Sequence, residues 1–208
     1  GTPYFLAWTT TPWTLPANVG LALHPRFTYV AGRFMKNGQT ENLVIVKELL
    51  DAFAQKTGWA LAETIRELKG AELENCEARH PFLSRTSTII LADFVTTDTG
   101  TGIVHIAPAF GEDDAPVGRR YDLPFAQFVD GKGHTTAEPP FAGLFVKDAD
   151  PKVLVDLESR GLLYDAPKFE HDYPFCWRCD TPLLYYARES WFIKMTAVKD
   201  DLIRNNNT

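Results

Sequence analysis

A threonine-rich segment with two prolines near the start of the chain constrains the fold of this sequence most. Residues 9–16 read TTTPWTLP, and each proline removes a backbone donor and biases the preceding residue toward extended conformations. We therefore expect an irregular or edge strand, in which Thr9 and Thr11 face one way and Thr10 the other. Two hydroxyls on one side suit the binding of a sugar, a water or a carbonyl, although β-branched residues also favour an ordinary edge strand.

A second segment, residues 100–114 (GTGIVHIAPAFGEDD), reads as a turn, a strand, a loop and the start of a helix. The apolar run 103–106 predicts a short buried strand, and His105 stands near its end. Asp113 and Asp114 precede a helical stretch, where acidic side chains cap the helix or interact with its dipole. For both acids, helix capping and ligand binding remain alternatives, as a hydrogen-bonded core role does for His105.

The order of the predicted elements favours the α+β fold class, built on a closed or nearly closed β-barrel-like core with peripheral helices. In the last predicted helix, Asp150 is expected to cap, Pro151 to occupy the first position and Gly161 to follow the end. Residues 59–69 fit either a helix or a strand, and residues 130–140 are expected to form a mobile surface loop that borders the site. Strands are predicted near residues 4–9, 27–34, 43–46, 87–94 and 103–106, and helices near residues 47–55, 113–121 and 151–159.

Composition and charge exclude several classes of function. With a formal net charge of −6, the chain is not expected to bind nucleic acid in general, because affinity for phosphates comes from clustered Lys and Arg. Its 208 residues suit one domain with a sizeable core. No apolar run is long enough to span a bilayer and no charged-then-apolar leader is present, so we expect a cytoplasmic protein without membrane association.

The three cysteines are too few for a disulfide framework. Cys176 and Cys179 have the C-x-x-C spacing of a metal knuckle, whereas Cys76 lies far away in the sequence. Because a structural zinc needs four ligands, the pair forms half a site, and we expect no tightly bound zinc in this chain alone.

Taken together, residues 9–18 (TTTPWTLPAN) and 100–114 resemble the editing domain, or first connective peptide, of class I aminoacyl-tRNA synthetases, specifically of the isoleucyl type. Residues 141–151 (FAGLFVKDADP) and 173–179 (YPFCWRC) also resemble that family, so the resemblance covers nearly the whole chain. Valyl and leucyl relatives usually carry an Arg after the first threonines, where this chain has Thr11-Pro12-Trp13. The HIGH and KMSKS signatures of the catalytic domain are absent, so the chain reads as an excised insertion that does not activate amino acids.

The resemblance implies roles for individual residues. Asp114 is expected to bind the α-ammonium of the substrate, since a carboxylate suits that charge. The threonines and Asn18 are expected to hold the water, the carbonyl or the ribose hydroxyls, and His105 to exclude a larger side chain, with catalytic base as its competing role. The implied catalytic residues are Thr9, Thr11, His105 and Asp114, and the implied substrate-binding residues are Thr10, Trp13, Asn18, His105, Ile106, Ala107 and Asp114.

The implied reaction is water-mediated hydrolysis of mischarged valyl-tRNA(Ile), of valyl-adenylate, or of both, with rejection of the isoleucyl group. No G-x-S-x-G, H-E-x-x-H or P-loop signature supports another hydrolase class. Isoleucyl-tRNA synthetase is itself the standard example of why a second pocket is needed, since one methylene is worth only about 1–3 kcal/mol of discrimination. A free-standing deacylase and a non-catalytic module that binds aminoacyl-tRNA 3′ ends are the alternatives.

The family's architecture also implies a domain division and partners. Residues 1–169 would form the editing core, and residues 170–208 a connector that returns toward a catalytic domain absent from this chain. In the full-length enzyme, ligands from outside the chain would complete a zinc site with Cys176 and Cys179; editing itself would need no cofactor. The expected partners are the 3′ end of tRNA(Ile) carrying valine, valyl-adenylate and the rest of the synthetase in cis, and the isolated chain is expected to be a monomer.

Overall fold

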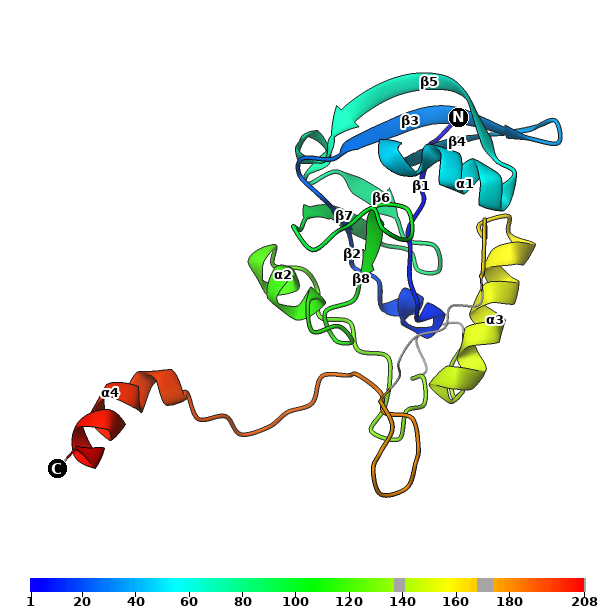
Figure 1. Cartoon of the computed structure of the whole chain (residues 1–208). Helices are drawn as coiled ribbons and strands as arrows, with labels where there is room; N and C mark the ends of the chain where they lie inside the picture. The colour runs from blue at the N-terminus through cyan, green and yellow to red at the C-terminus, as the bar shows by residue number, and fades with distance from the viewer. Residues whose placement is uncertain (137–140, 168–173, 208) are drawn as a thin grey trace.

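The structure, a computed structural model, describes residues 1–136, 141–167 and 174–207, and it places the strands of this part in two four-stranded sheets (Figure 1). Both sheets are mixed, because β1 pairs with β4 and β2 with β7 in parallel, whereas the other pairs are antiparallel. The first sheet has the order β1 (Tyr4–Phe5), β4 (Gln39–Val46), β3 (Thr28–Lys36), β5 (Ala60–Lys69). The second has the order β6 (Glu77–Arg79), β7 (Thr86–Leu91), β2 (Gly20–Leu23), β8 (Ile103–Ile106).

The prediction of a closed or nearly closed barrel is wrong. Within the described residues, the outer strands of one sheet do not pair with those of the other, and a single isolated bridge between Trp8 and Val104 links the N-terminal segment to β8. The segment that would close a barrel pairs with β4 over β1 only. Beyond β1, the Ala7 N–H donates to the Phe5 carbonyl of its own segment at 3.1 Å. The pairing of this segment with β4 therefore does not continue into its pairing with β8 as one ladder.

Strand β4 is buried on both faces over its last four residues, and this explains how the layers are arranged. Leu43 and Ile45 face a cluster that contains Phe53 of helix α1 (Leu50–Thr57). Val44 and Val46 face the cluster that also contains side chains from β2, β7 and β8. Alternation along one strand therefore packs α1 on one side of the first sheet and the second sheet on the other.

Tyr29 connects the two sheets through its hydroxyl. Its side chain is fully buried, the hydroxyl donates to the Gly102 carbonyl at 2.7 Å, and it accepts the His24 N–H at 2.9 Å. Burial raises the pKa of this phenol to about 12, so it stays neutral and able to donate. The hydroxyl thereby satisfies one backbone donor and one backbone acceptor at the ends of β2 and β8.

Removing that hydroxyl in Tyr29→Phe is expected to lower the free energy of unfolding by about 2 kcal/mol, because a buried N–H and a buried carbonyl lose their partner. Urea unfolding followed by circular dichroism measures this. Tyr4→Phe, at an exposed position, is the matched control and should stay within about 0.5 kcal/mol of the unchanged chain. Equal stabilities of the two variants would refute the connecting role of Tyr29.

The threonine-rich segment continues into a 3-10 helix, Pro12–Ala17, so the predicted irregular or edge strand is wrong for this part. Proline suits the first helical position, because its φ angle is preset and its missing N–H would be unsatisfied there anyway. Thr11, with φ −130° and ψ 77°, is outside the helical region, as expected before a proline, and its carbonyl accepts the Thr14 N–H at 3.0 Å. The 3-10 helix packs against α3 (Val146–Ser159).

Most other predicted elements are confirmed, namely the strands that became β3, β4, β7 and β8 and the helices that became α1 and α2 (Asp114–Arg120). Residues 59–69, which fitted either class, form strand β5 from Ala60 onward. The predicted start of α3 at Pro151 is wrong, because the helix begins at Val146 and Asp150 accepts the Trp13 N–H at 2.8 Å instead of capping. Gly161 follows the end of α3 with a φ of +68°, as predicted.

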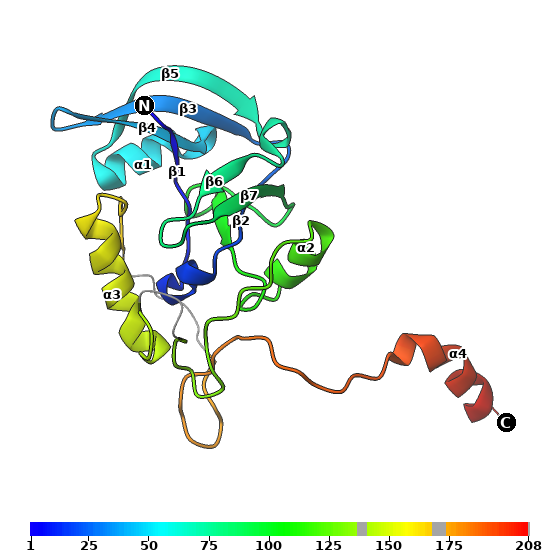
Figure 2. The same cartoon turned by 180° about the vertical axis from the view of Figure 1, so that it is seen from behind.

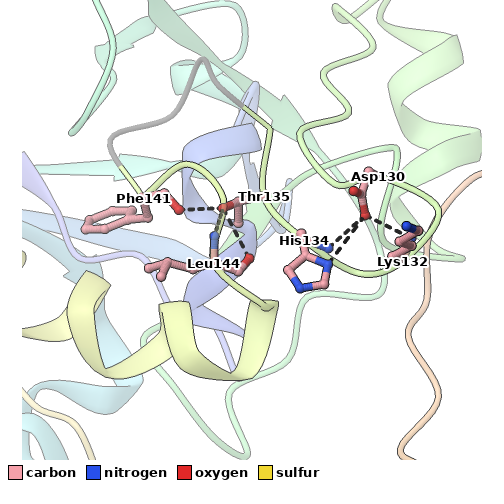
Figure 3. Close-up of polar contacts among 6 residues, drawn as sticks. All are labelled: Asp130, Lys132, His134, Thr135, Phe141 and Leu144. Carbon is pink, nitrogen blue, oxygen red and sulfur yellow. Dashed lines mark hydrogen bonds and ion pairs between the residues drawn. The ribbon is translucent and has the colours of Figure 1, made fainter.

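The loop beyond α2 is organised by Asp130. Its Oδ1 accepts the N–H groups of Lys132 at 2.8 Å and of His134 at 2.9 Å (Figure 3). The Thr135 hydroxyl donates to the Phe141 carbonyl and accepts the Leu144 N–H. Because the two N–H bonds favour the carboxylate, the pKa of Asp130 is lowered. Residues 137–140, which include the two prolines of the predicted loop, lie outside the described residues, and the predicted mobility stays a prediction.

The C-terminal part leaves the body of the chain as an extended segment that ends in helix α4 (Met195–Asn206), apart from the other elements in both views (Figures 1 and 2). Trp191, Phe192 and Ile193 are largely exposed on this segment. The predicted boundary between residues 169 and 170 falls among residues 168–173, which lie outside the described part, so the domain division stays a prediction.

Candidate functional site

The segment before the threonines runs beside the strand that carries the histidine. Trp8 N–H donates to the Ile103 carbonyl at 2.9 Å, and His105 N–H donates to the Trp8 carbonyl at 3.2 Å. This is a parallel bridge between Trp8 and Val104, and it brings two segments together that lie about 95 residues apart in the sequence. The threonine-rich segment therefore starts next to His105.

The His105 imidazole is held at both ring nitrogens. Nδ1 lies 2.6 Å from Nδ2 of Asn18, and Nε2 lies 3.0 Å from Oγ1 of Thr14. Burial, with a smaller contribution from the nearby His80, lowers the pKa of His105 to about 3, so the ring is neutral near pH 7. A neutral ring with both nitrogens engaged favours a structural or steric role over that of a catalytic base.

The three consecutive threonines differ in their surroundings. Thr10 is exposed, whereas Thr9 and Thr11 are half-buried, and their Oγ1 atoms lie 3.5 Å apart. Thr9 Oγ1 also accepts the Thr11 N–H at 3.1 Å, and Thr11 Oγ1 lies 3.1 Å from Oγ1 of Thr14. The hydroxyl groups of Thr9, Thr11 and Thr14 are thus hydrogen-bonded in series, and the series ends at Nε2 of His105.

Asp114 opens helix α2, and its carboxylate lies against the chain that leaves β8. Oδ2 accepts the Ala107 N–H at 2.7 Å, and the carboxyl group sits so close to Gly111 that a Cβ atom there would lie 2.6 Å from its Cγ. A side chain at position 111 would force the Asp114 carboxyl group to shift. Burial, partly offset by the Ala107 bond, raises the pKa of Asp114. Among the described residues, no other group donates to this carboxylate.

The structure therefore joins most predicted site residues into one network. Asp114 connects through the Ala107 backbone to His105, which connects to Asn18 and, through Thr14, to Thr11 and Thr9. The side chains of Ile106 and Ala107 are buried, and so is Trp13, whose ring meets Phe110 edge-on at a centroid distance of 5.1 Å. Thr10 lies outside the network.

Sequence reasoning missed four side chains that support this network. Thr14 lies within the threonine-rich segment, and its Oγ1 is 3.0 Å from Nε2 of His105. Ser87, buried on β7, donates to Oδ1 of Asn18 at 2.5 Å. Arg85 donates through Nη2 to the carbonyls of Pro16 at 3.0 Å and Asn18 at 2.8 Å. The fourth is His80. An isolated Ser, Arg or His carries no sequence signal of such a role, because the role depends on tertiary placement.

His80 is a buried neighbour of His105 and Arg85. Its Nδ1 accepts the N–H groups of Phe82 at 3.0 Å and Leu83 at 2.9 Å. Burial, with Arg85 as a second cause, lowers the pKa of His80 to about 4, so this ring is also neutral near pH 7. The two histidines thus add no positive charge beside the threonine-rich segment.

Cys176 and Cys179 lie in a tight turn. The Thr181 carbonyl accepts the Cys176 N–H at 2.9 Å, and the Thr181 hydroxyl lies 3.0 Å from Sγ of Cys179. The bond to Thr181 lowers the pKa of Cys179, which favours the thiolate that zinc binds. Two thiolates fit half of a tetrahedral site, and no cluster of three or more potential ligands occurs within the described ranges. The zinc site with outside ligands stays a prediction.

The described residues form two hollows, and neither is lined by Asp114, His105 or the threonines of residues 9–14. One is lined by apolar side chains under the 3-10 helix, including Trp13 and Phe110. The other lies between Phe125, Gln127 and the C-terminal segment at Tyr186 to Glu189. Among the described residues, no helix has the length and apolar character needed to cross a membrane.

Comparison with known proteins identifies the family. The sequence profile described as "Leucyl-tRNA synthetase, editing domain" matches residues 31–154. The isoleucine–tRNA ligase of Clostridium acetobutylicum is 48% identical over 98% of this chain and 19% of its own length, and that of Pyrococcus horikoshii is 42% identical over 98% of this chain and 20% of its own. The chain thus spans about a fifth of the length of these curated relatives.

Solved structures agree on the fold. The editing domain of the cytosolic leucyl-tRNA synthetase of P. falciparum has a TM-score of 0.63 and 13% identity, with 77% of each chain covered. That of P. knowlesi has a TM-score of 0.60 and 13% identity, with 89% of this chain and 84% of the other covered. The chain therefore belongs to the family of aminoacyl-tRNA synthetase editing domains, of the isoleucyl-tRNA synthetase type.

Proposed function

We propose that this editing domain hydrolyses valyl-tRNA(Ile), valyl-adenylate, or both, and spares the isoleucyl group. The observation that supports this most is the hydrogen-bond network that joins His105 to Asn18 and the threonine hydroxyls, with Asp114 bonded to the Ala107 N–H two residues beyond His105. These groups come from two segments that are distant in the sequence, and they meet the needs of an activated acyl substrate: a carboxylate for its ammonium group and hydroxyls for its oxygens.

In the proposed reaction, a positioned water attacks the acyl carbon and no side chain becomes covalently attached. The Asp114 carboxylate binds the free α-ammonium and so fixes the acyl group. Thr9 and Thr11 hold the carbonyl, the water or the terminal ribose. A base with a pKa near the working pH is not needed, because the ester and the mixed anhydride are already activated. This agrees with the low pKa of His105.

Selection between the two amino acids is assigned to His105. Its ring is fixed by Asn18 and Thr14, so it cannot move aside for a side chain that is larger by one methylene. A rigid wall rejects the larger group sterically, which is the task of a second pocket where simple binding discriminates too weakly.

The proposal also assigns roles to the rest of the full-length synthetase. The rest of the synthetase would act in cis, deliver the 3′ end of tRNA(Ile) and complete a zinc site with Cys176 and Cys179, in the cytoplasm. With its net charge of −6, the isolated chain would be a monomer that binds tRNA weakly.

The decisive assay compares the hydrolysis of valyl-tRNA(Ile) and isoleucyl-tRNA(Ile), by this chain and by the full-length ligase that carries it. We expect valyl-tRNA(Ile) to be cleaved at least about tenfold faster, since the network admits only the smaller group. Equal rates would contradict the proposed selectivity. Binding of valyl-tRNA(Ile) without turnover in both proteins would instead support a non-catalytic module.

A further inference from the structure

Four buried polar side chains surround the candidate site and are hydrogen-bonded in series. Ser87, Asn18, His105 and Thr14 are exposed by only 1%, 3%, 7% and 4%. Buried polar groups need hydrogen-bond partners, and each hydrogen bond has one donor and one acceptor. Backbone carbonyls can only accept, so where they contact such a series they determine which atom carries each proton.

The orientation of the Asn18 amide follows from the Gly20 carbonyl. That oxygen can only accept, so the amide atom 2.8 Å away must be the NH₂ group. The opposite amide atom is then Oδ1, which fits the Ser87 hydroxyl that donates to it. Ser87 and Gly20 thus hold the amide from both sides.

The fixed amide determines the tautomer of His105. The Asn18 NH₂ group also faces Nδ1 at 2.6 Å, so Nδ1 must be the acceptor. A neutral imidazole carries its one proton on the other nitrogen, and Nε2 therefore donates to Thr14 Oγ1 at 3.0 Å.

The positions of the threonine hydroxyl protons follow in the same way. The single hydroxyl proton of Thr14 goes to the Thr11 carbonyl at 2.8 Å, so Oγ1 of Thr14 can only accept from the Thr11 hydroxyl at 3.1 Å. Thr11 then has lone pairs but no proton left for a ligand. Thr9 Oγ1 accepts the Thr11 N–H, and its own proton faces only the distant Thr11 Oγ1 at 3.5 Å.

We propose that Ser87 and Asn18 are positioning residues of the editing reaction, which hold His105 as the neutral Nε2–H tautomer and thereby set the direction of the hydroxyls. As a consequence, Thr11 accepts hydrogen bonds from the substrate or the water, whereas Thr9 donates its proton to the carbonyl oxygen. The assignment rests on the proposed hydrolysis, but the proton positions on which it depends are testable without activity.

Nitrogen-15 NMR of the imidazole of His105 in the labelled chain tests the proton positions. We expect a protonated Nε2 and an unprotonated Nδ1 at pH 7. In Asn18→Asp, a carboxylate oxygen faces Nδ1, so the proton should move to Nδ1. A proton on Nδ1 in the unchanged chain would overturn the proposal whether or not the chain is active.

Kinetics of Ser87→Ala test the positioning role and do not depend on whether Asn18→Asp folds. Loss of the anchor for the Asn18 amide should lower kcat for valyl-tRNA(Ile) about tenfold and leave KM unchanged, because Ser87 touches no substrate. Thr86→Ala, the exposed neighbour on β7, is the control and should keep the full rate. An unchanged kcat in Ser87→Ala, or an equal loss in Thr86→Ala, would refute the role of Ser87. One outcome separates the two proposals: the unchanged protein does not hydrolyse the ester, and NMR still finds the proton on Nε2. In that case the proposed function is wrong and the tautomer assignment stands.

Discussion

Asp114→Ala abolishes the hydrolysis of valyl-tRNA(Ile), with an expected loss in kcat/KM of at least about a hundredfold. A hydrogen bond between charged groups is worth roughly 1.5–3 kcal/mol, and the α-ammonium loses both this bond and its orientation toward the water. The measurement is the rate of ester cleavage with the purified chain and with the full-length ligase.

Two variants distinguish the loss of the negative charge of Asp114 from a disturbance of the local structure. Asp114→Asn keeps an acceptor for the Ala107 N–H but removes the charge, so it should be folded and equally inactive. Asp113→Ala removes the exposed neighbouring carboxylate, whose side chain makes no capping bond to α2, and should keep the full rate. Full activity of Asp114→Asn would disprove the binding of the ammonium by charge.

The pH dependence follows from the raised pKa of Asp114. Only the ionised carboxylate binds the ammonium, so activity falls as the pH drops through the pKa, and burial places this fall at a higher pH than for an ordinary aspartate. The neighbouring Asp113 contributes to the rise. In Asp113→Ala the acid limb of the pH profile should therefore move to lower pH.

Local sequence patterns predicted the elements whose determinants are local. The apolar run of β8 and the glycine after α3 gave correct positions, because a short run of apolar residues and a left-handed residue are both visible in the local sequence. The closed barrel was a wrong prediction, since closure depends on which outer strands meet. The turn at Ala7, which stops the ladder, carries no sequence signal.

The candidate site could be predicted in part, by resemblance to known motifs. The threonine-rich segment and the segment with His105 and Asp114 were identified, and the structure joins them through the bridge at Trp8. The 3-10 helix was missed because prolines favour extended neighbours and helix starts alike. Ser87 was missed because its role arises from the pairing of β7 with β2, not from its neighbours in sequence.

Replacing His105 by alanine is expected to remove the steric barrier and let isoleucyl-tRNA(Ile) be hydrolysed at least about tenfold faster than by the unchanged chain. The ring is buried and occupies the space between Asn18 and Thr14, so its removal leaves room for more than the one extra methylene of isoleucine. Hydrolysis of valyl-tRNA(Ile) should continue at a reduced rate, because the threonines lose their fixed direction but the carboxylate of Asp114 remains.

A folding defect must be distinguished from this gain of activity. The buried Asn18 amide and Thr14 hydroxyl lose a partner in His105→Ala, so the free energy of unfolding should fall by about 2–4 kcal/mol, which urea unfolding measures. His134→Ala, in the loop held by Asp130, is the control for loss of a histidine and should spare isoleucyl-tRNA(Ile). A lowered stability alone cannot produce faster cleavage of the isoleucyl ester. If His105→Ala is folded, clears valyl-tRNA(Ile) and still spares isoleucyl-tRNA(Ile), then His105 is not the wall that excludes the larger amino acid.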